Sequence, residues 1–119
     1  MTKVVFFLVM ATPAWLAMTP AERNATTRKT LGTVLRRHPE VRLRYFDAEA
    51  YNARVSDVLM WEVNSEGAYR ALVEDLRETP FWGHYFNVRE IVMAVEDGFS
   101  KHYGVPRVGS GRPTTPDPG

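Results

Sequence analysis

Two stretches of this chain are apolar at consecutive positions, and they place the strongest limit on its fold. Residues 3–11 read Lys-Val-Val-Phe-Phe-Leu-Val-Met-Ala, and residues 57–63 are again apolar at most positions. A strand with one face in water alternates polar and apolar residues, whereas a continuous apolar run of this length indicates a strand covered on both faces. The fold must therefore cover both faces of its sheet.

The rest of the sequence predicts two further strands and two main helices. Thr19-Pro20-Ala21-Glu22 has the pattern of a helix start, and His38-Pro39 should end that helix at about residue 37. A second helix is expected from Asn64 or Ser65 to about residue 78. The alternating residues 41–47 and the segment 87–95 predict the remaining strands, and residues 97–103 a short terminal helix.

The resulting order, β-α-β-β-α-β, predicts a ferredoxin-like α+β domain over residues 1–105. Two helices cover only one face of a four-stranded sheet. We therefore expect a second copy of the chain to cover the other face, giving a homodimer that forms a dimeric α+β barrel. Residues 106–119 are rich in Pro, Gly, Ser and Thr, which predicts a disordered tail.

Charge and composition exclude several classes of function. Lys and Arg total 15 against 14 for Asp and Glu, a balance that argues against a nucleic-acid or membrane partner. There is no cysteine, and no glycine-rich phosphate loop, so we expect no disulfide and no nucleotide cofactor. The apolar run near the N-terminus is short for a signal peptide and fits a buried strand better, which predicts a cytoplasmic protein.

A cluster of ionisable residues on the second and third predicted strands is the first candidate site. The functional interpretation gives Asp47 or Asp57 the role of a base, while Arg44 or Arg54 holds an anionic group or developing negative charge. Antiparallel pairing would bring Arg44 close to Glu62 under an aromatic wall. The alternative is a structural network of salt bridges that orders residues 48–56.

His84 is the best single candidate for proton transfer, because it lies in an aromatic connector and titrates near neutral pH. A histidine that only packs among the aromatic rings is the alternative. The three histidines fit no local metal motif, so we expect no metal, although a site of two histidines and one carboxylate assembled in space stays open. An aromatic-rich set, several of whose members lie in connectors, is a candidate for a ligand pocket or for dimer packing: Trp15, Tyr45, Tyr51, Phe81, Trp82, Tyr85 and Phe86.

Several blocks of the sequence resemble the darcynin family. They are residues 7–9, 12–16, 44–51, 53–57, 61–62, 69, 76–82 and 84–86, and the resemblance extends over about residues 3–104. Darcynins are small bacterial proteins without an established activity, so this resemblance implies a fold and no reaction. The group of dimeric α+β barrels includes small oxygenases, isomerases, cyclases and dehalogenases, which is an analogy at the level of fold.

These observations predict a small homodimeric enzyme of specialised metabolism. It would act without a cofactor, as an oxygenase, cyclase or isomerase, on an aromatic, polyketide-like or enolisable small molecule. The first alternative is a non-catalytic protein that binds a small hydrophobic metabolite. The second is a structural subunit whose aromatic surfaces serve only assembly.

Overall fold

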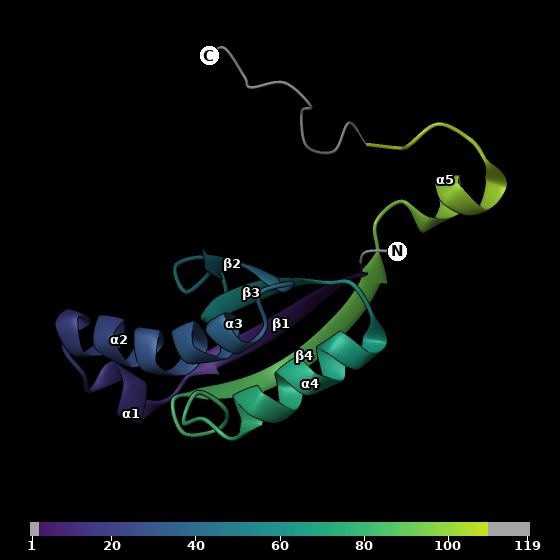
Figure 1. The fold of residues 1–119 in the computed structure, drawn as a ribbon. Helices are drawn as coiled ribbons and strands as arrows, with labels where there is room; N and C mark the ends of the chain where they lie inside the picture. The colour runs from purple at the N-terminus through teal and green to yellow at the C-terminus, as the bar shows by residue number, and fades with distance from the viewer. Residues whose placement is uncertain (1–2, 110–119) are drawn as a thin grey trace, which may run out of the picture.

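The computed structural model describes residues 3–109 and contains one four-stranded antiparallel sheet (Figure 1). Its strands are β1 (Lys3–Ala11), β2 (Arg42–Asp47), β3 (Asp57–Val63) and β4 (Phe86–Val95), in the spatial order β2-β3-β1-β4. The two strands with continuous apolar runs, β1 and β3, are the two central ones. The predicted ferredoxin-like α+β fold is thus confirmed.

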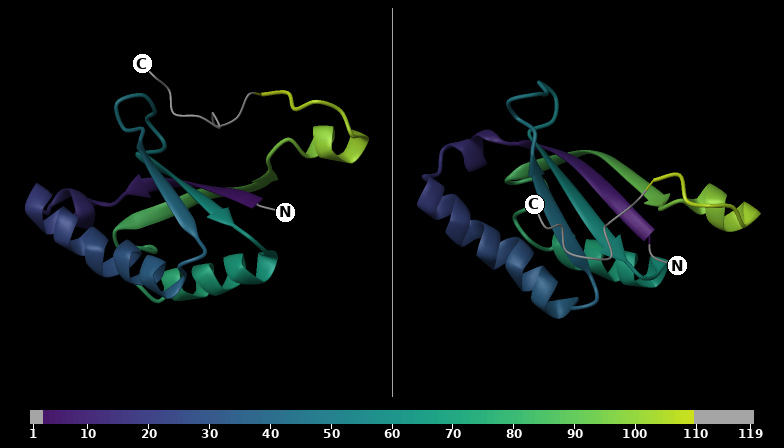
Figure 2. Two further views of the ribbon diagram at one scale, coloured as in Figure 1. Left: turned by 45° about the horizontal axis from the view of Figure 1, so that its top comes forward. Right: turned by 90° about the horizontal axis from the view of Figure 1, so that it is seen from above.

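The helices lie together on one side of this sheet (Figure 2). After the single turn α1 (Pro13–Leu16) comes a continuous helical stretch formed by α2 (Pro20–Thr27), the π-helical segment η1 (Arg28–Gly32) and α3 (Thr33–Arg37). The second main helix is α4 (Glu66–Arg77). Helix and sheet meet in a core that includes Phe7 and Trp61, whose rings pack edge to face with centroids 5.8 Å apart.

Side-chain caps fix where the helices begin. The Thr19 hydroxyl accepts a hydrogen bond from the Glu22 amide, and the Glu22 carboxylate accepts one from the Thr19 amide, which completes the predicted capping box. Thr12 caps α1 and Ser65 caps α4 in the same way. The helices therefore start at positions that the sequence itself dictates.

The other side of the sheet, which we call the open face, has no helix over it among residues 3–109 (Figure 2). Odd-numbered residues of β1 point toward the helices and are buried at positions 5, 7 and 9, whereas even-numbered residues point away. Phe46 and Val92 on this face are 40% and 41% exposed. The apolar residues of the open face are Val4, Phe6, Leu8, Met10, Phe46, Val58, Met60, Val92 and Ala94.

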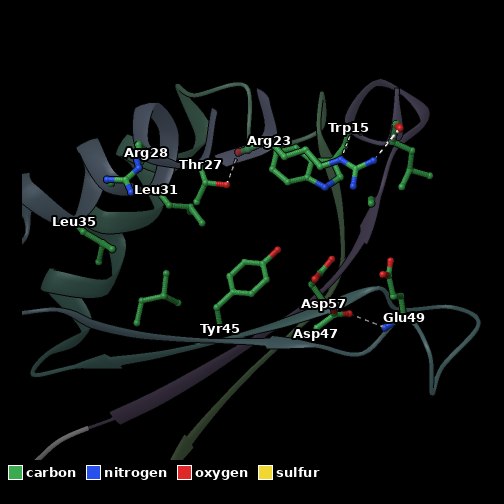
Figure 3. Close-up of a pocket in the computed structure, with 14 residues that line it drawn as sticks. Trp15, Arg23, Thr27, Arg28, Leu31, Leu35, Tyr45, Asp47, Glu49 and Asp57 are labelled. Carbon is green, nitrogen blue, oxygen red and sulfur yellow. Dashed lines mark hydrogen bonds between the residues drawn. The ribbon is translucent and has the colours of Figure 1, made fainter. Parts of the chain in front are cut away.

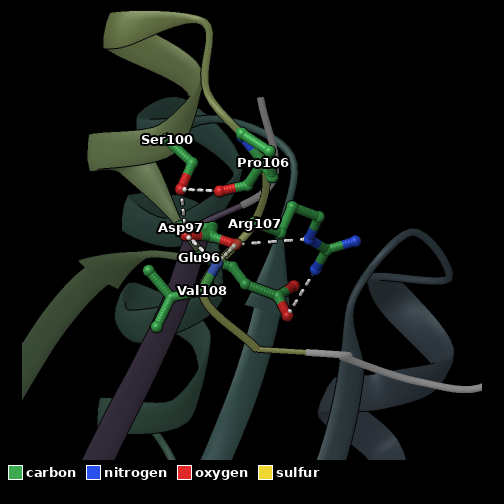
Figure 4. A network of polar contacts seen from close by, with 6 residues as sticks. All are labelled: Glu96, Asp97, Ser100, Pro106, Arg107 and Val108. Atoms are coloured by element: carbon green, nitrogen blue, oxygen red, sulfur yellow. Dashed lines mark hydrogen bonds and ion pairs between the residues drawn. The ribbon is translucent and has the colours of Figure 1, made fainter.

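Beyond β4 the chain forms α5 (Gly98–Tyr103), which projects from the end of the sheet (Figures 1 and 2). Asp97 turns the chain with a φ of 54°, and its carboxylate accepts hydrogen bonds from the Ser100 hydroxyl and the Val108 amide (Figure 4). Arg107 pairs with Glu96 at 2.9 Å. Residues 106–108 of the predicted tail thus contact Glu96, Asp97 and Ser100, which follow β4 in the chain. Residues 110–119 lie outside the described part of the chain.

Candidate functional site

A pocket of about 520 Å³ lies between the helical stretch α2–η1–α3 and the β2 side of the sheet (Figure 3). Leu31 and Leu35 from the helices and Leu43 from β2 give it apolar walls, and Trp15 from α1 closes one end. Three carboxylates and a tyrosine come from the sheet side: Asp47, Glu49, Asp57 and Tyr45. An apolar cavity with a few converging polar groups is the usual form of a small-molecule site.

The register of β2 and β3 brings two of these carboxylates together. Asp47 and Asp57 are direct cross-strand partners, and Tyr45 is the partner of buried Leu59. Alternate residues of a strand share a face, so Tyr45, Asp47 and Asp57 all lie on the side that the helices cover. The sheet thereby places two acids and a phenol on the floor of one pocket.

Asp57 is the carboxyl of the pocket whose pKa is shifted by its environment. Burial raises the pKa of its carboxyl above the ordinary value, and the neighbouring charges of Asp47 and Glu49 act in the same direction. The Ser56 hydroxyl donates a 2.7 Å hydrogen bond to the Asp57 carboxylate and lowers the pKa in part. The net result is a carboxyl that takes up a proton more readily than an exposed aspartate.

Tyr45 extends from β2 with its hydroxyl inside the pocket (Figure 3). The residue is 42% exposed overall. Burial of the hydroxyl end raises the pKa of this phenol well above its ordinary value, followed by the charges of Asp57, Asp47 and Glu49. Tyr45 therefore keeps its proton at neutral pH, and a hydrogen bond between its hydroxyl and the Asp57 carboxylate contributes to the shifted pKa of both groups.

Two arginines lie on the helix side, and their donors are partly used within the protein. Arg23 donates from Nε to the Trp15 carbonyl at 3.2 Å and from Nη2 to the Leu16 carbonyl at 3.0 Å. Arg28 donates from Nε to Asn24 at 2.9 Å. Among residues 3–109, neither arginine forms an ion pair with the carboxylates of the floor.

The predicted catalytic residues are divided by the sheet. Asp47 and Asp57 line the pocket, whereas Arg44 projects from the open face, where its guanidinium lies 5.1 Å from the centre of the Phe46 ring. Glu62 shares that face, next to Arg42 across the strands. Arg54 is exposed in the loop between β2 and β3. A single site that combines these arginines with the two aspartates does not form within this chain.

The alternative interpretation, a salt-bridge network around residues 48–56, is wrong for the described part of the chain, where these charged residues form no ion pair. The loop is held instead by hydrogen bonds to its backbone. The Asn52 side chain accepts from the amides of Arg54 and Val55, and the Ala48 amide donates to the Ser56 carbonyl. Local Asx contacts order this loop without any charge pairing.

His84 lies in the turn between α4 and β4, outside the lining of the pocket. Its carbonyl accepts a 2.6 Å hydrogen bond from the Thr12 hydroxyl, and its exposed ring lies 4.5 Å from the ring of Tyr85. Tyr85 in turn packs edge to face on Trp15, with ring centroids 5.7 Å apart. The His84 ring thus contacts Tyr85, and Tyr85 contacts Trp15. Of these three residues only Trp15 lines the pocket.

The predicted aromatic set also divides. Trp15 and Tyr45 line the pocket, while Tyr51 is 89% exposed at the loop tip. Phe81 is buried and stacks on Phe86 at 5.0 Å. Trp82 packs on Phe7 at 5.8 Å. Phe81, Phe86 and Trp82 thus belong mainly to the core.

Sequence reasoning missed the helical wall of the pocket. Arg23, Thr27, Leu31 and Leu35 follow one another at spacings of four, and all of them line it. A spacing of four places these residues on one face of the helix, and this pattern is visible in the sequence. The face mixes polar and apolar residues, however, so the pattern does not identify it as a buried face. Arg28 and Gly32, which belong to the π-helical segment, line the pocket as well.

Within residues 3–109, no three histidine, aspartate or glutamate side chains are arranged to hold a metal ion. None of the helices in that range combines the length and the apolar character that crossing a membrane requires.

Solved structures with a similar fold include chlorite dismutases from Candidatus Nitrospira defluvii. A mutant form matches with a TM-score of 0.69 at 10% identity, over 88% of this chain and 44% of that chain. The complex with imidazole matches with a TM-score of 0.66 at 8% identity, over 79% of this chain and 39% of that one. The present chain thus spans less than half of these longer chains, and identities this low show the fold alone.

Relatives in sequence are much closer. A darcynin homolog of Streptomyces avermitilis is 45% identical over 101 residues, which cover 84% of each chain. Another from Granulibacter bethesdensis is 42% identical over 105 residues, covering 87% of this chain and 85% of that one. The family model of darcynin, described as a domain of unknown function, matches residues 2–111. The chain therefore belongs to the darcynin family.

Proposed function

We propose that this protein is a small homodimeric enzyme of specialised metabolism that binds an aromatic, polyketide-like or enolisable molecule in the pocket between the helices and β2. The observation that carries the proposal is Asp57, a half-buried carboxyl with a raised pKa on the floor of an apolar pocket. Perturbed carboxyls in pockets are a recurring sign of acid–base chemistry. Its reaction would be a cofactor-independent oxygenation, cyclisation or isomerisation.

The proton-transfer step common to these reactions suits the two floor groups. The Asp57 carboxylate would remove a proton from the carbon next to a carbonyl, which leaves negative charge on the carbonyl oxygen. The Tyr45 hydroxyl, which keeps its proton at neutral pH, would donate a hydrogen bond to that oxygen. This role replaces the one expected of Arg44 and Arg54, since neither lines the pocket.

Solvent exchange tests the step without knowledge of the natural substrate. Tetralone, an aromatic ketone with enolisable C–H bonds, is incubated with the protein in deuterium oxide, and deuterium uptake is followed by mass spectrometry. We expect the wild type to accelerate uptake and Asp57→Asn to lose about a hundredfold of that acceleration or more. Glu74→Gln, which removes an exposed carboxylate of α4, is the matched control and should exchange like wild type.

A non-catalytic binding protein for a small hydrophobic metabolite is the second candidate. It is favoured by one observation, the position of His84 outside the pocket lining, which leaves that lining without a histidine. Saturable binding of tetralone without any acceleration of exchange would support this candidate over the enzyme.

We also propose that two copies pack through their open faces. The apolar residues there would otherwise remain in water, and central strands β1 and β3 carry most of them. On this face β2 presents Arg42 and Arg44, whereas β4 at the other edge presents Glu90. A twofold axis parallel to the strands sets β2 of each copy against β4 of the other, so that unlike charges meet. We further propose a cytoplasmic location, since the short apolar run of residues 4–11 is accounted for by β1.

A further inference from the structure

We infer that the pocket selects a ligand with a positively charged amine attached to an aromatic or apolar body. The inference rests on the proposed function, because it names the chemical class of the molecule that this same pocket binds. It is carried by the distribution of charge between the two sides of the pocket and by the cavity that separates them.

The floor of the pocket carries negative charge that no basic residue neutralises by contact. Asp47, Glu49 and Asp57 line the cavity, and within residues 3–109 none of them forms an ion pair. Figure 3 shows Asp57 and Glu49 rising from the sheet side toward the space below the helices. Carboxylates that share a site repel one another, so a cation placed among them would be stabilised.

The two arginines of the helix side, Arg23 and Arg28, also line the pocket, and each directs donors to other groups of the protein instead of to the acids. Arg23 is turned toward the carbonyls at the end of α1, which it caps. At the Tyr45 hydroxyl the charges that act on the pKa are those of Asp57, Asp47 and Glu49, and all three raise it. Burial is the main cause of that raised pKa, and the three carboxylates add to it from the same side of the cavity.

A metal ion is a poor candidate for the missing positive charge. The described residues contain no set of three side chains that converges on one point for a metal. An ammonium group needs only one or two acceptors at hydrogen-bond distance and tolerates spread carboxylates. The apolar walls of Leu31, Leu35 and Leu43, with the Trp15 ring at one end, would take the rest of such a molecule.

The three carboxylates differ in exposure, and this difference assigns them separate roles. Asp47 and Glu49 are the exposed acids of the floor and would hold the amine, whereas Asp57 is partly buried and would lie nearer the body of the ligand. The cation site and the proposed base are therefore different residues, which allows them to be tested separately.

Three probes with the same ring separate the charge preference from simple apolar binding: phenethylamine, phenethyl alcohol and phenylpropionate. Their affinities are measured by calorimetric titration at low ionic strength. We expect the cation to bind at least tenfold more tightly than the alcohol or the anion, and added salt to reduce this advantage. Thr27→Phe, which fills the pocket from α2, should weaken all three and so locate the binding.

The double variant Asp47→Asn with Glu49→Gln should lower the affinity for phenethylamine to that for the alcohol, while binding of the alcohol stays unchanged. The Asp47→Asn change retains a side-chain oxygen that can accept from the amide of residue 49, so the loop is expected to keep its form. Each single variant, checked by circular dichroism, replaces the double variant if that one does not fold. Glu74→Gln is again the control.

Equal binding of the three probes, stronger binding of the anion, or no binding of any probe overturns this inference. None of these results decides the proposed function, because the exchange of deuterium into uncharged tetralone depends on Asp57 and not on the amine site. Conversely, selective binding of the cation by a protein that fails to exchange tetralone supports the inference and contradicts the enzyme.

Discussion

At the scale of single residues, three properties of Asp57 define its place in the site. It is the first residue of central strand β3, it is partly buried, and its acceptor is paired with the Ser56 hydroxyl. Ser56 is itself fixed, since its Oγ accepts the Ala11 amide at 2.8 Å. The orientation of Asp57 is thus set by β1, an element more than forty residues away in sequence.

The raised pKa of Asp57 predicts a pH dependence of stability. The folded state holds this proton more tightly than the unfolded chain, whose carboxyl titrates near the ordinary value of 3.8. The contribution to the free energy of unfolding is therefore complete below that pH and is lost as the pH rises through the folded pKa. The Asp57→Asn variant has no carboxyl at this position, so its free energy of unfolding does not fall in this way. The free energy of unfolding of the variant should therefore increase relative to that of the wild type between pH 4 and 7.

Urea unfolding of both proteins at several pH values measures that difference. The Glu74→Gln variant, which removes an exposed carboxylate of α4 outside the pocket, is measured beside them as the control for the loss of one acidic group. A constant difference for Asp57→Asn would mean that the carboxyl titrates alike in the folded and unfolded chain.

The sequence predicts the candidate site only for residues on strands, because the alternation of a strand determines on which face of the sheet each side chain lies. Spacing along β2 puts Asp47 with Tyr45, and that pair does line the pocket. The same alternation puts Arg44 on the opposite face, a consequence that clustering along the sequence conceals. His84 could not be positioned in advance, because its turn is held by Thr12, 72 residues earlier.

At the scale of elements, the helix and strand boundaries followed mainly from local chemistry. The helix that was expected to start after Thr19 and end before His38 spans Pro20 to Arg37. Its interior was less predictable. The π-helical segment at Arg28–Gly32 inserts one wide turn, and nothing in its residue types distinguishes it from an α-helix. Packing on the sheet decides such a feature, and it also affects which residues face the pocket.

The capping box of α2 gives a prediction for this element. Thr19→Ala removes the hydroxyl that accepts the Glu22 amide, and loss of a cap of this type costs about 1 kcal/mol of unfolding free energy. Thr19→Asp supplies another acceptor and should retain most of the stability. Both are measured by urea unfolding at neutral pH. Equal losses in the two variants would show that the hydroxyl is not acting as a cap.

At the scale of the whole molecule, the open face is the feature that the isolated chain leaves unexplained. Four apolar side chains of β1, at even positions from Val4 to Met10, lie on it beside Val58 and Met60 of β3. A central strand that is apolar on both sides gains from burial on both sides, at roughly 25 cal/mol for each Å² removed from water. A second sheet packed at about 10 Å would bury this face along its length.

Met60→Glu tests the packing of two copies, because its side chain lies near the centre of the open face. In a single copy the carboxylate would remain in water and the fold should tolerate it. In the proposed dimer the charge would be buried without a partner, which is strongly unfavourable. We expect the wild type to sediment as a dimer at micromolar concentration, and the variant as a folded monomer.

Tyr51→Glu provides the matched control, since it adds the same charge in place of an apolar group on a loop tip that is 89% exposed. It should remain dimeric. A wild type that is monomeric at micromolar concentration would contradict packing through the open face, and a Met60→Glu variant that stays dimeric would place the interface elsewhere. The pocket lies on the opposite side of the sheet, so the monomeric variant should still bind phenethylamine if the site is complete within one chain.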